Sequence, residues 1–226
     1  MGINYSPKVA KDNLVVYYDV ANPKCWSGSG TPNDLSKLGN DVTSNVGSIA
    51  STTKGGALCW EFNATSMYFY TAFSNGQPTT NATLEAWIYP ETEVSEGDRG
   101  TIILLTGGNQ CYMSWNKSNR ELSNYWYSKS PAGYHETGAP MDRDAWHHLC
   151  SVWDNDNSTL YQYVDGVKTS VTTVGTSTAN TGMRVGMEST GRQFSGGISV
   201  VKVYNSALSE DEVMQSYHAL KSRFGH

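Results

Sequence analysis

The chain has 226 residues and a formal net charge of −5, and only 16% of its residues are charged. Its 16 Lys and Arg residues are spread without a cluster, which argues against a nucleic-acid partner. No apolar run approaches the roughly 20 residues that a membrane span needs, and the first residues lack the apolar core of a signal peptide. We therefore expect neither membrane insertion nor secretion.

Strand patterns dominate the chain from residue 14 onward. Short apolar or alternating runs, separated by turn residues, recur every roughly 8–15 residues with no helical pattern between them. These runs are LVVYYD, ALCWEF, TLEAWIYP, GTIILLTGG, QCYMSWN, ELSNYWY, WHHLCSVW, STLYQYV, VKTSVTTV, GMRVGM and GISVVKVY. They predict an all-β protein with two antiparallel sheets packed as a sandwich.

Two segments fall outside this pattern. Residues 1–13 are a candidate N-terminal arm, and residues 22–54, rich in Gly, Ser, Asn and Pro, predict a long irregular loop. Loops of that length usually contact a partner or carry function, so Trp26 in this loop is a candidate contact residue. No linker divides the rest, and we expect residues 14–224 to form a single domain.

Near the end of the chain, one hairpin and one helix are well marked. Asp165 and Gly166 stand between two strand runs and predict a two-residue hairpin loop. Ser209 and Glu212 have the spacing of a capping box, which predicts a helix starting after Ser209.

The stretch DAWHHLC raises the question of a metal or catalytic site. Neighbouring side chains on a strand point to opposite faces, so the two histidines cannot easily share one metal ion. The helical zinc motif H-E-x-x-H is absent. We expect framework roles for Trp146, His147 and His148, and for Asp165 and Gly166 of the hairpin. The four cysteines include no C-x-x-C pair, and we expect buried thiols.

Carboxylates are poorly arranged for glycoside hydrolysis, which needs two of them at a fixed separation across a cleft. Glu85 and Glu91 have Pro90 between them, and Asp154 and Asp156 lie in a turn. That turn also lacks the glycine and distal Glu of an EF-hand loop. These patterns predict no catalytic residue and no specific metal site.

Aromatic residues in the stretch SNYWYSKSPAGYHETG are candidates for contact with a ligand or partner. On a strand, Tyr125 and Tyr127 would share one face and Trp126 the other, with Tyr134 and His135 in the Gly/Pro loop that follows. Trp and Tyr rings anchor interfaces and pack against ligands. The same pattern is typical of packing inside a large sandwich, and both interpretations stay open.

Several motifs, taken in order, resemble the laminin G-like and pentraxin-like domains of the concanavalin A-like lectin/glucanase jelly rolls. The stretch WHHLCSVWDNDNSTLYQYVDGV resembles their central hairpin, and ATLEAWIYP resembles their first central strand. VGMESTGRQFSGGISVVKVYNSALSEDEV resembles their closing pattern. The resemblance covers about residues 57–224 and implies a jelly roll with one short C-terminal helix.

The two ends of the chain resemble laminin G-like domains in structural proteins of tailed bacteriophages. The stretches concerned are LVVYYDVANPKCWSGSGTPNDLS and SYHALKSRFG. This resemblance implies a virion protein made in the host cytoplasm, as a capsid-decoration, neck or tail-fibre component. Its partners would be other virion proteins and, at exposed loops, cell-surface glycan.

Calcium ligands of the pentraxin-like relatives are mostly missing. Where those domains have an Asp-Asn pair and a Glu-Gln-Asp run, this chain reads Gly108-Asn109 and Glu188-Ser189-Thr190. Only Asn109 and Glu188 carry over, as weak calcium candidates, and we expect no cofactor.

The sequence therefore predicts a non-enzymatic bacteriophage virion structural or surface protein that acts by protein association and glycan contact. The alternative is a soluble carbohydrate-binding lectin module assisted by calcium. A glycoside hydrolase is the third hypothesis. The sequence does not indicate an oligomeric state.

Overall fold

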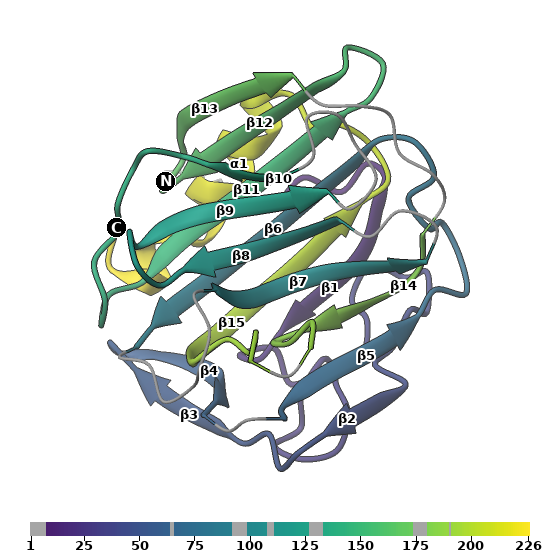
Figure 1. Cartoon of the computed structure of the whole chain (residues 1–226). Coiled ribbons are helices and arrows are strands. Elements are labelled where there is room, and N and C mark those ends of the chain that lie inside the picture. Colours follow the sequence, from purple (N-terminus) through teal and green to yellow (C-terminus); the bar gives the residue numbers. More distant parts are fainter. Residues whose placement is uncertain are drawn as a thin grey trace, which may run out of the picture.

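The computed structural model describes residues 8–63, 66–91, 99–107, 111–126, 133–173, 180–189 and 191–226. Its strands form two antiparallel sheets that face each other, with a helix behind one of them (Figure 1). The sandwich predicted from the strand patterns is thus confirmed.

The first sheet has eight strands in the order β13-β12-β11-β6-β15-β4-β3, with β1 also paired to β15. Its strands are β1 (Leu14–Asp19), β3 (Ser51–Lys54), β4 (Ala57–Phe62), β6 (Ala82–Pro90), β11 (His147–Asp154), β12 (Thr159–Val164), β13 (Val167–Thr173) and β15 (Gly196–Tyr204).

The second sheet has seven strands in the order β10-β9-β8-β7-β14-β5-β2. Its strands are β2 (Ser44–Val46), β5 (Tyr68–Ala72), β7 (Arg99–Gly107), β8 (Cys111–Asn116), β9 (Glu121–Trp126), β10 (Gly133–Glu136) and β14 (Asn180–Val185).

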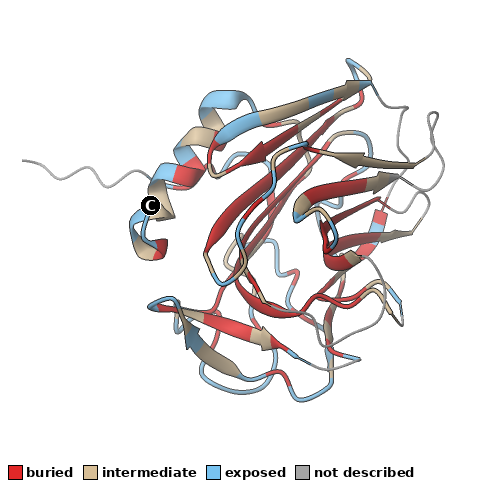
Figure 2. Ribbon diagram, turned by 60° about the vertical axis from the view of Figure 1, so that its left-hand side comes forward, coloured by how far each residue is buried: buried red, intermediate tan, exposed pale blue. Residues whose placement is uncertain are grey.

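The main hydrophobic core lies between the sheets, because alternate residues of each strand point inward. Trp60 of the first sheet and Phe69 of the second meet edge to face, with ring centroids 5.3 Å apart. Trp115 and Trp153 fill the same core from opposite sheets. Figure 2 shows buried residues concentrated along the facing strands.

The outer face of the first sheet is covered by α1 (Glu210–Leu220) and the short 3-10 helix Lys221–Phe224. Ser209 and Glu212 form the predicted capping box. Trp87 of β6 stacks on Tyr217 and Phe224, with ring centroids 5.8 Å and 4.1 Å away. Aromatic packing therefore fixes the helix on this face, while the outer face of the second sheet carries no helix among the described residues.

Residues 8–13 of the predicted N-terminal arm also lie on the helix side. The backbone N–H of Ala10 donates to Ser216, and Gln215 donates to the carbonyl of Lys8. In the part of the chain that the structure describes, no helix is long and apolar enough to cross a membrane.

The segment 22–54 is less irregular than its composition predicts. It contains β2 and β3, which extend one edge of each sheet. Polar residues form these edge strands because pairing with β5 and β4 satisfies their backbone groups, which composition alone does not reveal.

The hairpin between β12 and β13 is formed as predicted. Asp165 and Gly166 have φ values of 51° and 79°, the left-handed pair that a two-residue hairpin turn requires. All four cysteines are free and buried, in agreement with the sequence-based expectation.

Candidate functional site

A single row of residues crosses the outer face of the second sheet from edge to edge. Each strand contributes one residue, and each is paired in register with its neighbour. In sheet order the row is Tyr134, Tyr125, Tyr112, Leu104, Arg184, Tyr70 and Ser44. Four of these seven residues are tyrosines, on a face that no helix of the described chain covers.

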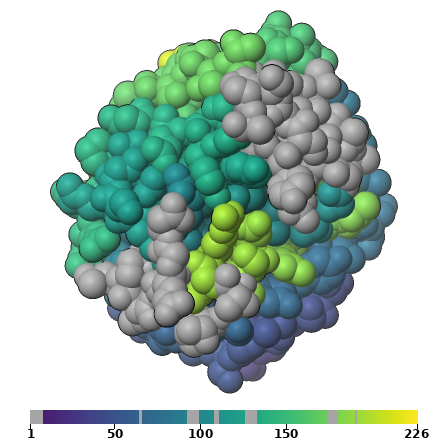
Figure 3. All heavy atoms as spheres, in the orientation of Figure 1, coloured from purple at the N-terminus to yellow at the C-terminus, as the bar shows by residue number. Residues whose placement is uncertain are grey.

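Two hollows lie along this row. One, of about 300 Å³, is bordered by three tyrosines of the row, Tyr112, Tyr125 and Tyr134. The other, of about 540 Å³, contains Arg184 and Tyr70 in its wall. Both are bordered by residues of the segment after β14, which Figure 3 shows in lime across the middle of this face. We call the two hollows together the groove.

The tyrosine end of the groove is a packed cluster. Tyr112 and Tyr125 stack with ring centroids 5.1 Å apart, and Tyr134 tilts against Tyr125 at 4.8 Å. Arg192 Nη1 donates to the hydroxyls of Tyr112 and Tyr134 at 2.9 and 2.7 Å. It also reaches Glu188 Oε2 at 3.1 Å. The arginine therefore fixes the orientation of two tyrosines while its own charge is balanced.

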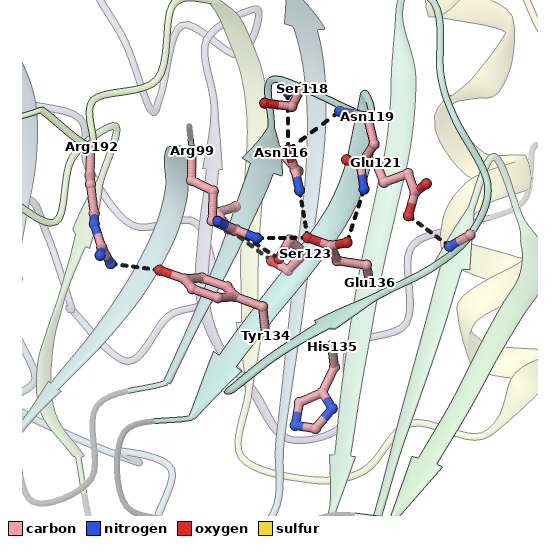
Figure 4. Close-up of polar contacts among 12 residues, drawn as sticks. Arg99, Asn116, Ser118, Asn119, Glu121, Ser123, Tyr134, His135, Glu136 and Arg192 are labelled. Atoms are coloured by element: carbon pink, nitrogen blue, oxygen red, sulfur yellow. Dashed lines mark hydrogen bonds and ion pairs between the residues drawn. The ribbon is translucent and has the colours of Figure 1, made fainter. Parts of the chain in front are cut away.

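A second polar network supports Tyr134 from the side (Figure 4). Glu136 Oε1 accepts from Arg99 Nη2 at 2.7 Å and from Asn116, and its Oε2 accepts from Asn119 at 2.9 Å. Burial acts to raise the pKa of Glu136, but the hydrogen bonds from these three side chains outweigh it, so the pKa lies below its usual value. The Arg99 guanidinium lies 3.5 Å from the centre of the Tyr134 ring, which it holds by a cation–π contact.

Arg184 lines the larger hollow. Its Nη1 donates to the backbone carbonyl of Glu188 at 2.9 Å, and its guanidinium lies 5.1 Å from the centre of the Tyr68 ring. Among the described residues no carboxylate pairs with it.

The predicted contact residues are only partly brought together. Tyr125 and Tyr134 adjoin in the groove. Tyr134 and His135 lie on the edge strand β10, not in the loop that the Gly and Pro residues predict, because the strand pairs with β9. His135 points to the other side of β10, where burial lowers its pKa (Figure 4).

The remaining predicted contacts lie elsewhere. Trp26 is only 5% exposed and meets Trp60 edge to face in the main core, so it is a core residue and not a surface contact. Trp126 ends β9, and its side chain lies outside the described residues, as does the whole of Tyr127.

The weak calcium candidates do not form a cation site in the described structure. The carboxylate of Glu188 is taken by Arg192, and Asn109 lies outside the described residues. In the described ranges no group of three or more His, Cys, Asp or Glu side chains is placed to hold a metal ion.

The DAWHHLC residues lie away from the groove. His147 Nδ1 contacts Asp165 Oδ2 at 2.9 Å, which ties β11 to the hairpin. His148 lies on the opposite face, 3.1 Å from Glu85 Oε1 and beneath α1. Trp146 is buried against Phe224 in the hydrophobic cluster under the 3-10 helix.

Several residues of the groove and of the polar network beside it were not identified from the sequence. They are Tyr68, Tyr70, Arg99, Tyr112, Glu136, Arg184 and Arg192. A signal was present, because Tyr112 alternates with Cys111 and Met113, and Arg184 stands between Met183 and Val185. What the alternation cannot show is that the outward residues of seven strands fall in one row.

The fold and the groove together define a jelly-roll β-sandwich in which, among the described residues, a helix covers one sheet and not the other. Residues 63–214 match the family model described as the Concanavalin A-like lectin/glucanases superfamily, and the chain belongs to this family. No curated protein sequence matches it.

Solved structures with the same fold are distant in sequence. The binding domain of Paraclostridial Mosquitocidal Protein 1 is 16% identical with a TM-score of 0.69, over 92% of this chain and 52% of that one. This chain therefore spans about half the length of that binding domain.

Domain 4 of AbnA, a GH43 extracellular arabinanase from Geobacillus stearothermophilus solved with arabinotriose, is 18% identical with a TM-score of 0.62. The match covers 91% of this chain and 98% of the AbnA domain. A SAP-like pentraxin from Limulus polyphemus is 16% identical with a TM-score of 0.54, over 72% and 82% of the two chains.

Proposed function

We propose that the chain is a carbohydrate-binding module that holds a glycan in the groove. The observation that carries this proposal is the in-register row of tyrosines, in which the rings of Tyr70, Tyr125 and Tyr134 are half-buried and Tyr112 is buried beside them. Six interstrand steps of about 4.8 Å make the row about 29 Å long, enough for several sugar rings. Domain 4 of AbnA, solved in complex with arabinotriose, is a protein of similar fold with a bound sugar.

The tyrosines suit this task because they are already ordered. Hydrogen bonds from Arg192 and the Arg99 cation–π contact restrain Tyr112 and Tyr134 before a ligand arrives. Binding then loses little side-chain freedom, which is the usual advantage of a preorganised site.

The two carboxylates nearest the tyrosine cluster lack the properties that a glycosidase needs. A glycosidase needs an acid whose pKa is raised, opposite a second carboxylate. The pKa of Glu136 is lowered instead, and Glu188 is ion-paired with Arg192. We therefore propose a non-enzymatic role.

For the biological setting we propose a surface component of a tailed-bacteriophage virion, with other virion proteins as its second class of partner. The resemblance of both ends of the sequence to phage structural proteins supports this setting. Cosedimentation of the chain with purified virions is the expected result, and its consistent absence from virions would contradict the setting but not the glycan proposal.

A glycan array with Tyr125→Ala tests the binding proposal. Removing this ring from the tyrosine cluster should weaken binding by roughly tenfold or more, as loss of an aromatic anchor does. Tyr161→Ala is the matched control and should bind normally, because Tyr161 lies on β12 of the first sheet and packs against the cluster that holds Val213 of α1. We expect binding to persist in EDTA. If no glycan binds, or if Tyr125→Ala binds as wild type does, the groove is not the glycan site.

A further inference from the structure

Three arginines lie in or beside the groove, and only two of them have a carboxylate partner in the described chain. Arg99 pairs with Glu136, and Arg192 pairs with Glu188. Arg184 pairs with neither, and it donates only to a neutral backbone carbonyl. The described groove therefore carries an unbalanced positive charge, although the whole chain has a net charge of −5.

The donors of Arg184 are not used up by the described protein. Nη2 has no hydrogen-bond partner among the described residues, and Nε is buried without one. A guanidinium whose donors are partly desolvated and unmatched gains from an anionic acceptor, because charge-assisted hydrogen bonds are stronger than neutral ones.

The surroundings of Arg184 suit a sugar ring as well as an anion. The wall of the larger hollow includes the rings of Tyr68 and Tyr70 and the hydroxyl residues Ser44 and Thr106. Arg184 is two strands from Tyr112 in the same row, a distance of about 10 Å. Glu188 and Ser189 border both hollows, so a ligand of several sugar rings held at the tyrosine cluster would be long enough to reach Arg184.

We propose that Arg184 binds the carboxylate of an acidic sugar, so that the module selects glycans containing uronic- or sialic-acid-type residues. This inference rests on the proposed glycan binding and adds the class of sugar. The tyrosine cluster holds neutral rings, and the larger hollow, with its single unpaired arginine, holds the acidic one.

An array of matched glycans tests the inference directly. Each acidic member, such as trigalacturonate or sialyllactose, is paired with its carboxyl methyl ester, which keeps the rings and removes the charge. We expect wild-type protein to prefer the acids by about tenfold, the effect of one charge-assisted hydrogen bond. That preference should shrink as salt is raised, whereas binding of the esters should not change.

Variants then assign the preference to one side chain. Arg184→Gln should bind acid and ester equally, and Arg184→Lys should retain part of the preference because it keeps the charge. Arg120→Gln, an exposed arginine outside the groove, should behave as wild type. Equal melting temperatures for the variants would confirm that they are folded.

The possible failures are distinguishable. If acids and esters bind equally well and Tyr125→Ala abolishes both, the groove is a glycan site and the acidic preference is wrong. Selective binding of sulfated members in place of carboxylated ones would also overturn the carboxylate assignment. If no member binds, both proposals fail.

Discussion

At the scale of single residues, the most unusual feature is a fully buried group of ionisable side chains beneath α1. Glu85, His148 and Lys202 each have 0% exposure, on three neighbouring strands. Glu85 Oε1 is 2.6 Å from Lys202 Nζ and 3.1 Å from His148 Nε2. Burial raises the pKa of Glu85, but the attraction of Lys202 and the His148 hydrogen bond outweigh it and leave the pKa at about 2.

Replacing Glu85 by Gln should destabilise the protein strongly. The substitution keeps the shape but leaves the Lys202 ammonium without a carboxylate, at a typical cost of about 3–5 kcal/mol in the free energy of unfolding. Urea unfolding of Glu85→Gln against wild type measures this cost. Glu61→Gln, in a partly exposed pair with Lys54, is the control and should cost less than about 1 kcal/mol. Equal losses of unfolding free energy in the two variants would show that the buried Glu85–Lys202 pair matters no more for stability than the partly exposed Glu61–Lys54 pair.

The same carboxylate should make stability depend on pH in acid. The pKa of Glu85 is about 2 in the folded state, below its ordinary value of 4.5. Between these two pH values the unfolded chain binds a proton at Glu85 and the folded chain does not, so acid favours unfolding. Its contribution, of about 3 kcal/mol, is complete above pH 4.5 and is lost as the pH falls toward 2. Unfolding measured between pH 2 and 6 should show a loss in wild type that Glu85→Gln largely lacks.

At the scale of secondary-structure elements, the hairpin and the helix depend on each other. Gly166 has a φ of 79° and lies so close to α1 that an added Cβ would come within 2.7 Å of the Tyr217 ring. Asp165 accepts from the backbone N–H of His148 and contacts the ring of His147. The turn is therefore held from two sides, by β11 and by α1.

Gly166→Ala should test this dependence. The positive φ alone should cost about 1 kcal/mol, and contact with Tyr217 should raise the total to about 2–4 kcal/mol. Gly225 provides the matched control, because it has a similar φ of 81° and open space around it. Thermal unfolding should show a clearly larger loss for Gly166→Ala than for Gly225→Ala. Equal losses of thermal stability in the two variants would mean that the Tyr217 ring moves away from the added methyl group without cost.

Secondary-structure elements that are specified by a short local motif could be predicted from the sequence. Elements that form because a distant strand pairs with them could not. The Asp165-Gly166 turn and the Ser209–Glu212 capping box are local chemistry, and both are present. Strands β2, β3 and β10 are polar edge strands that exist because a neighbouring strand pairs with them. Their sequences look like loops, because nothing in them requires burial.

At the scale of the whole molecule, the two outer faces have different roles. One is covered by α1 and holds the buried ionisable group, and the other, which no helix of the described chain covers, carries the groove (Figure 1). The tyrosines could be singled out from sequence, since Tyr125 and Tyr134 stand in an aromatic stretch. The row itself could not, because it joins residues from 44 to 184 through a register that only the folded sheet defines.

The two faces should nevertheless unfold as one unit. The main core takes side chains from both sheets, so neither sheet keeps its buried surface when the other is lost. Val213→Ala, on α1 at the far side from the groove, should lower stability by roughly 1–3 kcal/mol. Native-state hydrogen exchange should then show the slowest amides of β8 accelerated by the same factor as those of β6, about tenfold per 1.4 kcal/mol. Faster exchange in β6 with unchanged exchange in β8 would show two independent units and contradict a single domain.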